Sequence, residues 1–435
     1  MSSKTKTSAT QEEAIPALVP QLRFPEFRGA EGWHASTLGE LSEVVRGGSP
    51  RPIDGFITTS PDGLNWLKIG DVDKEAKYVT NTAEKVRPEA LSKTRVVNPG
   101  DLILSNSMSF GRPYILQITT CIHDGWIAIT NISKKTHRDF LYYLISAPGS
   151  QSYFLDNAAG SGVLNLNADI IKALRVCFPG PPEQQKIAEC LSSVDELIAA
   201  QARKLDALKT HKKGLMQQLF PREGETQPRL RFPEFHDAPA WEEKMLEDLA
   251  KRGSGHTPSK SHPEYYGGGI KWISLADSRH LDHGLISETK NEISEEGINN
   301  SSAVLHPAGT VLVSRDAGVG KSAVMASAMA VSQHFIVWTC DSTRLSNWFL
   351  YYLLQKMKPL FERAATGSTI KTIGLQFFLD LKVTVPSPEE QHRIATCLTS
   401  LDDLIAAHSH RLAALQTHKQ GLLQQLFPTL EDTGA

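Results

Sequence analysis

The chain has 435 residues, 40% of them hydrophobic, and its 46 basic and 48 acidic residues give a formal net charge of −2. This length exceeds what one ordinary hydrophobic core accommodates, and it predicts two to four domains. No apolar run approaches the roughly 18 residues of a membrane span, and the start, MSSKTKTSATQEEA, lacks the apolar segment of a signal peptide. We therefore expect a soluble, cytoplasmic protein whose near-neutral charge does not by itself indicate nucleic-acid binding.

The five cysteines form no CxxC pair, and no Cys/His cluster has the spacing of zinc ligands. We expect reduced cysteines and neither a disulfide framework nor a bound metal.

The chain contains an internal repeat. Residues 1–20 are predicted to be a disordered tail, after which LRFPEF at Leu22–Phe27 recurs at Leu230–Phe235. Trp33 and Trp241 follow the two copies at the same distance. We predict one globular module over residues 21–179 and a second over residues 232–386.

Between these anchors the two modules diverge, yet a common frame persists. PGDLILS ending at Ser105 corresponds to PAGTVLVS ending at Ser314, and FLYYLI at Phe140–Ile145 corresponds to FLYYLL at Phe349–Leu354. The apolar positions persist while the polar residues change, which predicts the same fold with different surface chemistry.

Each module is followed by a predicted long helix, over residues 180–221 and 387–428. Aligned at an offset of 207, residues 181–221 and 388–428 are identical at 26 of 41 positions. Apolar residues recur at alternating steps of four and three, the heptad pattern of a helix pair. The predicted seam consists of Ile187, Leu191, Val194, Ile198, Gln201, Leu205 and Leu208 in the first helix and Ile394, Leu398, Leu401, Ile405, His408, Leu412 and Leu415 in the second.

A helix of about 38 residues is roughly 57 Å long. The linker over residues 222–231 is too short to lead the chain back along it, so an antiparallel coiled coil is the simplest closure. Gln201 and His408 would then face each other near the middle of the seam and fix its register. An ordinary core-facing helix is the alternative interpretation. Residues 429–435 are predicted to be a C-terminal tail.

Catalytic motifs are not apparent. VLVSRDAGVGKSAV at Val311–Val324 resembles a phosphate-binding loop, but Arg315 stands where the first glycine is required before Gly320, Lys321 and Ser322. A strand followed by a variable polar loop is the better interpretation, and we expect no enzymatic activity in this chain.

Taken together, these motifs resemble the specificity subunits of type I restriction-modification systems. The resemblance extends along the chain from about residue 20. In each half it rests on a Gly-Ser loop, a helix start containing Glu-Gln and Ile-Ala, and a helix end containing Gly-Leu and Gln-Gln-Leu-Phe. These elements are Gly160 and Ser161, Glu183, Gln184, Ile187 and Ala188, and Lys212–Phe220, and in the second copy Gly367 and Ser368, Glu390, Gln391, Ile394 and Ala395, and Lys419–Phe427.

The resemblance implies an α+β protein with two target-recognition domains separated by two long helices, related by an internal pseudo-two-fold axis. It implies a non-catalytic subunit that binds double-stranded DNA at a bipartite target with a non-specific spacer set by the helices. The implied partners are two methyltransferase subunits and motor and nuclease subunits, which use S-adenosylmethionine, ATP and Mg. They methylate adenine or cleave DNA, and we expect no cofactor on this chain.

Polar loop residues beside the predicted strands are the candidate DNA contacts, since Arg pairs with guanine and Asn with adenine. Solvated surface charge is the alternative for each one. A coiled-coil scaffold without sequence-specific DNA binding remains the alternative function, and an ATP-dependent enzyme would rest on Gly320–Ser322 alone. The candidates are Arg46, Arg51, Lys68, Ser105, Asn106 and Arg112 in the first module and Arg252, Lys260, Lys271, Arg315, Asp316, Lys321 and Lys371 in the second.

Overall fold

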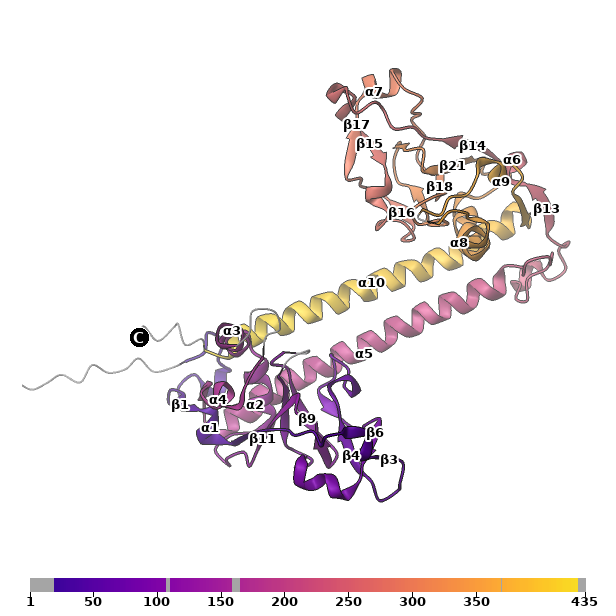
Figure 1. Cartoon of the computed structure of the whole chain (residues 1–435). Helices are drawn as coiled ribbons and strands as arrows, with labels where there is room; N and C mark the ends of the chain where they lie inside the picture. Colours follow the sequence, from indigo (N-terminus) through magenta and orange to yellow (C-terminus); the bar gives the residue numbers. More distant parts are fainter. Residues whose placement is uncertain (1–18, 107–109, 159–164, 369, 429–435) are drawn as a thin grey trace, which may run out of the picture. The chain divides into compact units, whose positions relative to one another are not determined.

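The computed structural model describes residues 19–106, 110–158, 165–368 and 370–428 (Figure 1). By its contacts the chain divides into two compact units, a first of residues 1–200 and 412–435 and a second of residues 201–411. Each unit therefore combines one globular module with the beginning of one long helix and the end of the other. The predicted tails, residues 1–20 and 429–435, lie almost wholly outside the described residues.

The first module is built on two five-stranded sheets, ordered β3-β6-β4-β10-β7 and β2-β11-β8-β9-β5, and on the antiparallel pair β1-β12. Its helices are α1 (Leu38–Leu41), α2 (Arg138–Ser146), α3 (Pro148–Asn157) and α4 (Ala168–Lys172). Its strands are β1 (His34–Thr37), β2 (Glu43–Arg46), β3 (Ile57–Thr58), β4 (Leu64–Leu67), β5 (Tyr78–Val79), β6 (Glu84–Val86), β7 (Arg95–Val97), β8 (Leu102–Ser105), β9 (Pro113–Leu116), β10 (Thr120–Ile122), β11 (Trp126–Thr130) and β12 (Arg175–Phe178).

The second module has a five-stranded sheet ordered β14-β21-β18-β19-β16, a three-stranded sheet ordered β17-β15-β20 and the pair β13-β22. Its helices are α6 (Leu246–Leu249), α7 (Glu295–Asn299), α8 (Asn347–Ala364) and α9 (Leu375–Leu379). Its strands are β13 (Glu242–Met245), β14 (Ala250–Ser254), β15 (Tyr266–Ile273), β16 (Leu285–Ile286), β17 (Asn291–Ile293), β18 (Val311–Ser314), β19 (Ser322–Met325), β20 (Ala330–Val331), β21 (Phe335–Cys340) and β22 (Lys382–Val385).

The strand order repeats even where the sequence repeat has faded. In the sheets β2-β11-β8-β9-β5 and β14-β21-β18-β19-β16, only the last pair of strands is parallel, β5 with β9 and β16 with β19. The second sheet of each module also contains one parallel pair, β4 with β10 and β15 with β20. The predicted α+β class and internal repeat are therefore confirmed at the level of topology.

The repeated QQLFP ending buries an aromatic ring in the core of a module. In the first unit Phe427 packs with Trp33 and Phe140 at ring distances of 6.4 and 5.3 Å. In the second unit Phe220 packs in the same way with Trp241 and Phe349, at 6.2 and 5.3 Å. The end of each long helix therefore docks beside the tryptophan that follows the LRFPEF phrase.

The two long helices are α5 (Pro181–Leu219) and α10 (Pro388–Leu426), each of 39 residues and thus about 58 Å long. Within the second unit, Gln201 contacts His408 and Lys212 contacts Asp402. The residue numbers therefore rise along α5 as they fall along α10, and the two segments run antiparallel. In the first unit the corresponding pairing joins Asp195 to Lys419. All fourteen predicted seam residues are buried or half-buried.

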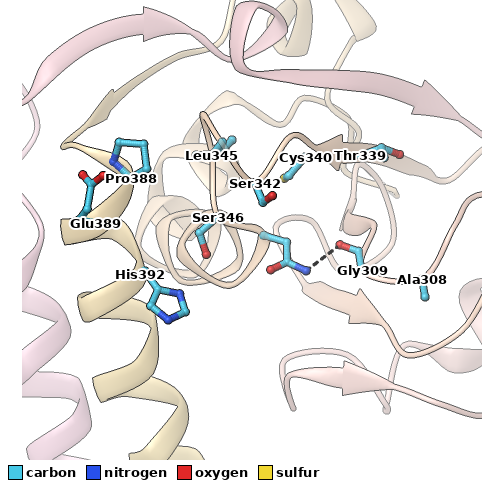
Figure 2. Close-up of a pocket in the computed structure, with 11 residues that line it drawn as sticks. Ala308, Gly309, Thr339, Cys340, Ser342, Leu345, Ser346, Pro388, Glu389 and His392 are labelled. Atoms are coloured by element: carbon cyan, nitrogen blue, oxygen red, sulfur yellow. Dashed lines mark hydrogen bonds between the residues drawn. The ribbon is translucent and has the colours of Figure 1, made fainter.

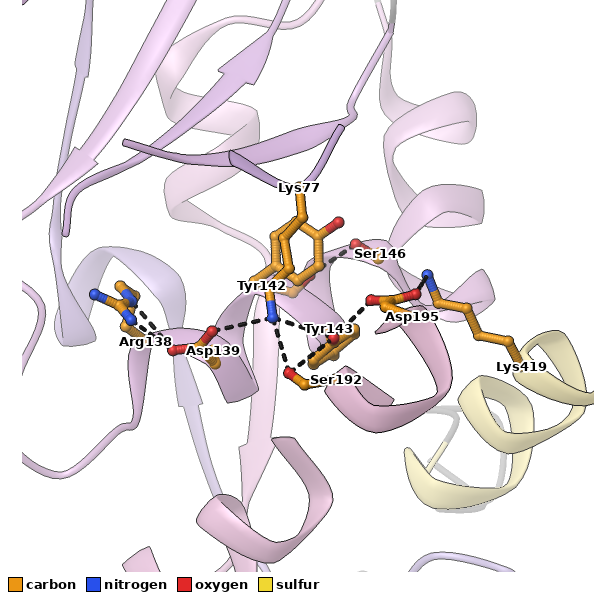
Figure 3. Close-up of polar contacts among 9 residues, drawn as sticks. All are labelled: Lys77, Arg138, Asp139, Tyr142, Tyr143, Ser146, Ser192, Asp195 and Lys419. Carbon is orange, nitrogen blue, oxygen red and sulfur yellow. Dashed lines mark hydrogen bonds and ion pairs between the residues drawn. The ribbon is translucent and has the colours of Figure 1, made fainter. Parts of the chain in front are cut away.

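A polar cluster joins each module to both helices. In the first unit the Tyr143 hydroxyl donates to Asp195 Oδ2 at 2.7 Å, and Lys419 Nζ lies 2.6 Å from Asp195 Oδ1 (Figure 3). In the second unit Tyr352 donates to Asp402 at 2.7 Å, and Lys212 lies 2.5 Å from the same carboxylate. The buried tyrosines come from the two FLYYL segments, on α2 and α8.

Candidate nucleic-acid interface

Three loops of the first module meet at one end of strands β2, β11 and β8, which are neighbours in the sheet β2-β11-β8-β9-β5. They follow β2, follow β8, and join β10 to β11 with a turn whose tip is His123–Gly125. Backbone hydrogen bonds hold the three loops to one another and to β4. They run from Gly48 N to Ile122 O (3.2 Å), from His123 N to Leu67 O (3.2 Å), from Trp126 N to His123 O (3.0 Å) and from Asn106 N to Gly125 O (3.0 Å).

The second module has an equivalent set of backbone hydrogen bonds, which we call the frame. It is made by the loops after β14 and β18 and by the turn between β20 and β21. Its hydrogen bonds correspond one to one with those of the first module. They run from His256 N to Val331 O (3.0 Å), from Ser332 N to Ile273 O (2.9 Å), from Phe335 N to Ser332 O (3.2 Å) and from Arg315 N to His334 O (2.9 Å). The frame thus makes Asp124 equivalent to Gln333 and Ser49 equivalent to Thr257.

In the first module, cations and donors surround Asp124. Its carboxylate accepts from Ser49 Oγ at 2.9 Å and lies 3.0 Å from His123 Nε2 and 3.5 Å from an Arg51 guanidinium nitrogen. Its backbone carbonyl accepts from Arg46 Nε at 2.9 Å. Burial raises the pKa of this carboxyl, but the Ser49 hydrogen bond and the neighbouring positive charges outweigh it, so the net pKa is lowered and Asp124 is ionised near neutral pH.

In the second module an uncharged glutamine, Gln333, occupies the tip of the turn. Thr257 donates to Gln333 Oε1 at 2.5 Å, and His334 Nδ1 lies 2.9 Å from Asp316 Oδ2. Beside this turn lies a hollow of about 640 Å³. Side chains with hydroxyl, amide, imidazole, ammonium and aromatic groups line it, namely Thr257, Lys260, Tyr266, Trp272, Ser274, Asn291, Ser332, Gln333 and His334.

The structure brings six of the predicted contact residues to these loops. Arg46, Arg51 and Asn106 surround the Asp124 turn. Arg315 donates to the Ile373 carbonyl at 3.2 Å, and Asp316 bridges to Thr372, the residue next to Lys371. Lys260 stands at the hollow of the second module.

Five other predicted contacts interact with residues outside these loops: four in side-chain ion pairs and one with a backbone carbonyl. Lys68 pairs with Glu84 at 2.6 Å, and Arg112 lies 3.5 Å from Glu75. In the second module Arg252 pairs with Glu247, Lys271 pairs with Glu288, and Lys321 donates to the Ser278 carbonyl.

Two predicted contact residues are buried. Ser105 is the last residue of β8 rather than a loop residue, and it is fully buried. Asn106 is only 2% exposed; its side-chain Nδ2 donates to the Asp124 backbone carbonyl at 3.1 Å, and its backbone carbonyl accepts from Leu166 N. Asn106 therefore closes the loop frame instead of facing solvent.

The segment that resembles a phosphate-binding loop is the hairpin between β18 and β19. These strands pair antiparallel, with Val313 opposite Ser322, so the glycines lead into a strand and not into a helix. The predicted strand and polar loop are thus confirmed, and the helix N-terminus that would bind a phosphate is not at this position.

The two predicted Gly-Ser loops are those of Gly160–Ser161 and Gly367–Ser368. Gly160 and Ser161 lie outside the described residues. Gly367 has a φ of +121°, and an added Cβ would lie 2.3 Å from the Ile370 carbonyl oxygen, so this position requires glycine.

A further hollow of about 600 Å³ lies where α8 and α10 begin (Figure 2). Glu389 and His392 of α10 line it together with Ser346, which caps α8, and Asn347 of α8. Among the described residues, no group of three or more His, Cys, Asp or Glu side chains is placed to hold a metal ion. None of the helices in that part of the chain is long and apolar enough to cross a membrane.

Sequence reasoning missed Asp124 and Gln333, the residues at the tips of the two turns. CIHDGW and VSQHF share only a buried residue before the turn and an aromatic residue after it. Aligning these aromatic residues, Trp126 and Phe335, would have placed the two tips together.

Comparison with known proteins now identifies the family. The family model described as the type I restriction modification DNA specificity domain matches residues 30–210 and again residues 239–417. The chain belongs to this family. Its function is that of a specificity subunit of a type I restriction-modification system, which favours DNA recognition over a scaffold role.

Relatives and solved structures agree with this assignment. The chain is 22% identical to the type I restriction enzyme MjaVIII specificity subunit of Methanocaldococcus jannaschii over 93% of this chain and 95% of that protein. It is 31% identical to the MjaIX specificity subunit of the same organism over 38% of each chain. The crystal structure of the S subunit of a type I restriction-modification system from M. genitalium matches with a TM-score of 0.60 and 16% identity, covering 94% of this chain and 99% of that one.

Proposed function

We propose that each module binds one half of a bipartite duplex target and that the two half-sites flank a spacer of unspecified bases. The observation that carries this proposal is the hydrogen-bond frame shared by the two modules. The four backbone hydrogen bonds of the frame recur in both modules, whereas the side chains at the turn tips differ in charge, with Asp124 in one and Gln333 in the other. A fixed frame with variable polar groups suits recognition of different base edges.

The partners follow from the chemistry that the specificity family serves. We propose that two methyltransferase subunits bind this chain, in keeping with its two equivalent helix ends, and that motor and nuclease subunits join the same complex. S-adenosylmethionine, ATP and Mg are used by those subunits, and this chain itself catalyses no step. Because the complex acts on cellular DNA, we expect it in the cytoplasm.

The net charge of −2 bears on affinity, because phosphate neutralisation by Lys and Arg supplies much of DNA binding. We expect the isolated chain to bind DNA weakly and the complex to bind it tightly. A filter-binding or anisotropy titration at two salt concentrations, with and without the methyltransferase subunits, measures this difference.

The long helices are proposed to set the spacer. Inserting four residues into both α5 and α10, at equivalent positions, lengthens the pair by about 6 Å. At about 3.4 Å per base pair, the preferred spacer should then grow by roughly two base pairs. An unchanged spacer would exclude the spacing role while leaving the recognition role intact.

Methylome sequencing of cells that express this chain with its partner subunits tests the proposal directly. We expect adenine methylation at one bipartite motif. Replacing residues 30–178 by the module of another family member should change one half-site and leave the other unchanged. Methylation without a bipartite motif, or a change in both half-sites, would contradict the assignment of one half-site to each module.

A further inference from the structure

The turn tips occupy equivalent places and are oriented in the same way. A hydroxyl from the loop after the first strand of the sheet donates to one oxygen of each tip side chain, from Ser49 to Asp124 Oδ1 at 2.9 Å and from Thr257 to Gln333 Oε1 at 2.5 Å. The second polar atom of each tip is thereby the one that a ligand meets. The hydroxyl fixes the side chain before binding, which reduces the entropy lost on recognition.

In the first module, the free end of the tip is an acceptor beside a guanidinium. Asp124 Oδ2 lies 3.5 Å from Arg51, whose side chain is 83% exposed, while the Asp124 side chain is 30% exposed. Arginine donates to guanine O6 and N7, and a carboxylate accepts from cytosine N4. Arg51 and Asp124 together therefore present both halves of the pattern that matches a single G·C pair.

In the second module, the free end of the tip is a donor. Gln333 is exposed, and within the described residues its Nε2 has no hydrogen-bond partner. Nε2 can donate to adenine N7, and Oε1, which keeps a second lone pair beside the Thr257 hydrogen bond, can accept from adenine N6. Arg46, which contacts the Asp124 carbonyl, corresponds through the strand register to Ser254, and the His334–Asp316 pair lies beside Gln333.

We propose that position 124 in the first module and position 333 in the second are the equivalent base-contacting positions of the two half-sites. Asp124 with Arg51 selects a G·C pair, and Gln333 selects an A·T pair. This inference rests on the proposed function and assigns specificity-determining residues to it. It also assigns the role of Ser49 and Thr257, which position the contacting side chains without touching a base.

The experiment is methylome sequencing of cells that carry the complete methyltransferase complex with single variants of this chain. Arg51→Lys removes the bidentate contact at an exposed side chain and keeps the charge, and Asp124→Asn keeps the shape of the tip. Each should relax one G·C position in one half-site. Because a bidentate contact discriminates by about 1–3 kcal/mol, methylation of the original motif should fall about 5- to 150-fold relative to its single-base neighbours.

Gln333→Glu is the matched variant of the second module, since it keeps the oxygen that Thr257 holds and removes the amide donor. It should relax one A·T position in the other half-site by a comparable factor and leave the first half-site unchanged. Glu89→Gln and Glu296→Gln change exposed carboxyls elsewhere in the two modules and serve as controls that keep the motif.

The outcomes separate the inference from the function on which it rests. A wild-type motif with no G·C pair in the half-site of the first module, or an unaltered motif in Arg51→Lys and Gln333→Glu, overturns the inference while the chain remains a specificity subunit. Wild-type complex that methylates without sequence preference overturns the proposed function. Gel filtration of each variant with the partner subunits shows whether the complex assembles, and it thereby distinguishes altered recognition from misfolding.

Discussion

The two units solve the same packing problem with different chemistry. In the first unit Lys77, just before β5, reaches across α2 and lies 3.1 Å from Asp139, with Tyr142 and Tyr143 beside its ammonium group (Figure 3). The backbone pairing makes Gly284 the equivalent residue in the second unit, since Lys77 O accepts from Ile115 and Gly284 O accepts from Val324. There an added Cβ would lie 3.3 Å from the ring of Trp348.

An ion pair in one unit is therefore replaced by a tryptophan over a glycine in the other. The tyrosines that bond to the helix carboxylates, Tyr143 and Tyr352, keep their places in both. The comparison shows which contacts the architecture requires. The tyrosine–carboxylate bonds that join module to helix are repeated, whereas the contacts of Lys77, which include a hydrogen bond to Ser192 of α5 at 2.9 Å, vary provided that the space is filled.

The largest expected effect concerns a contact that is repeated. Arg23 forms a bidentate pair with Glu183 at 2.9 and 2.8 Å, and Arg231 does the same with Glu390 at 2.8 and 2.6 Å. Both carboxylates are almost fully buried. Glu183→Ala or Glu390→Ala leaves a buried guanidinium without its partner, and each should lower the free energy of unfolding by about 3–5 kcal/mol in chemical denaturation.

Exposed ion pairs at the same two helix starts provide the control. Glu26 pairs with Lys186 and Glu234 pairs with Arg393, and all four side chains are about half exposed. Glu26→Ala and Glu234→Ala should leave the denaturation midpoint unchanged, because solvent screens such pairs. A shift as large as that of Glu183→Ala would show that burial does not govern these contacts.

A smaller effect is expected where the units differ. Lys77→Met keeps most of the side-chain volume and removes the ammonium group from Asp139 and Tyr143. It should destabilise the first unit by about 1–3 kcal/mol, the cost of leaving buried polar groups without a partner. Hydrogen exchange followed by peptide should report faster opening of α2 and β5 and no change in β16 and α8.

The same ion pair predicts a dependence on pH. Burial raises the pKa of the Asp139 carboxyl, but the hydrogen bonds and charges of Arg138 and Lys77 outweigh it, so the pKa is lowered on folding. The stabilisation is thus fully present above the unfolded value of about 3.9 and is lost as the pH falls through the folded value. The stability difference between wild type and Lys77→Met should shrink below about pH 4, and a constant difference in urea titrations would contradict the pairing.

Much of this architecture could be predicted from the sequence because the repeat exposes it. Ile187, Leu191, Ile394 and Leu398 recur at heptad spacing, and the structure buries all four in the module cores. The site was less accessible. Ser105 and Asn106 look like loop donors in the sequence, yet β8 is a central strand and the polar group of Asn106 is used in closing the frame.

The reason for this difference is physical. A core position is defined by periodicity along one segment, whereas a contact position is defined by three loops that are far apart in the sequence. Asp124 becomes notable only when Ser49, 75 residues earlier, is known to hold its carboxylate. Sequence reasoning that favoured Arg and Asn by type could not identify the acidic residue that orients them.

The smallest expected effect concerns the middle of the helix pair. Gln201 Nε2 lies 2.6 Å from His408 Nδ1 and donates to the His408 carbonyl at 2.9 Å, and Gln201 is only 9% exposed. Gln201→Leu alone leaves the imidazole without this partner and should cost about 0.5–1.5 kcal/mol in urea denaturation. The double variant Gln201→Leu with His408→Leu restores a continuous apolar seam and should regain most of that loss.

The Gln201–His408 pair would then fix the register of the helix pair rather than stabilise it, as a single polar residue does in other coiled coils. If so, the double variant should permit the seam to slip, and the Lys212–Asp402 pair, which forms only in the present register, should weaken. Asp402→Asn should consequently cost less in the double variant than in the wild-type chain. Equal costs in the two backgrounds would show that the apolar residues alone determine the register.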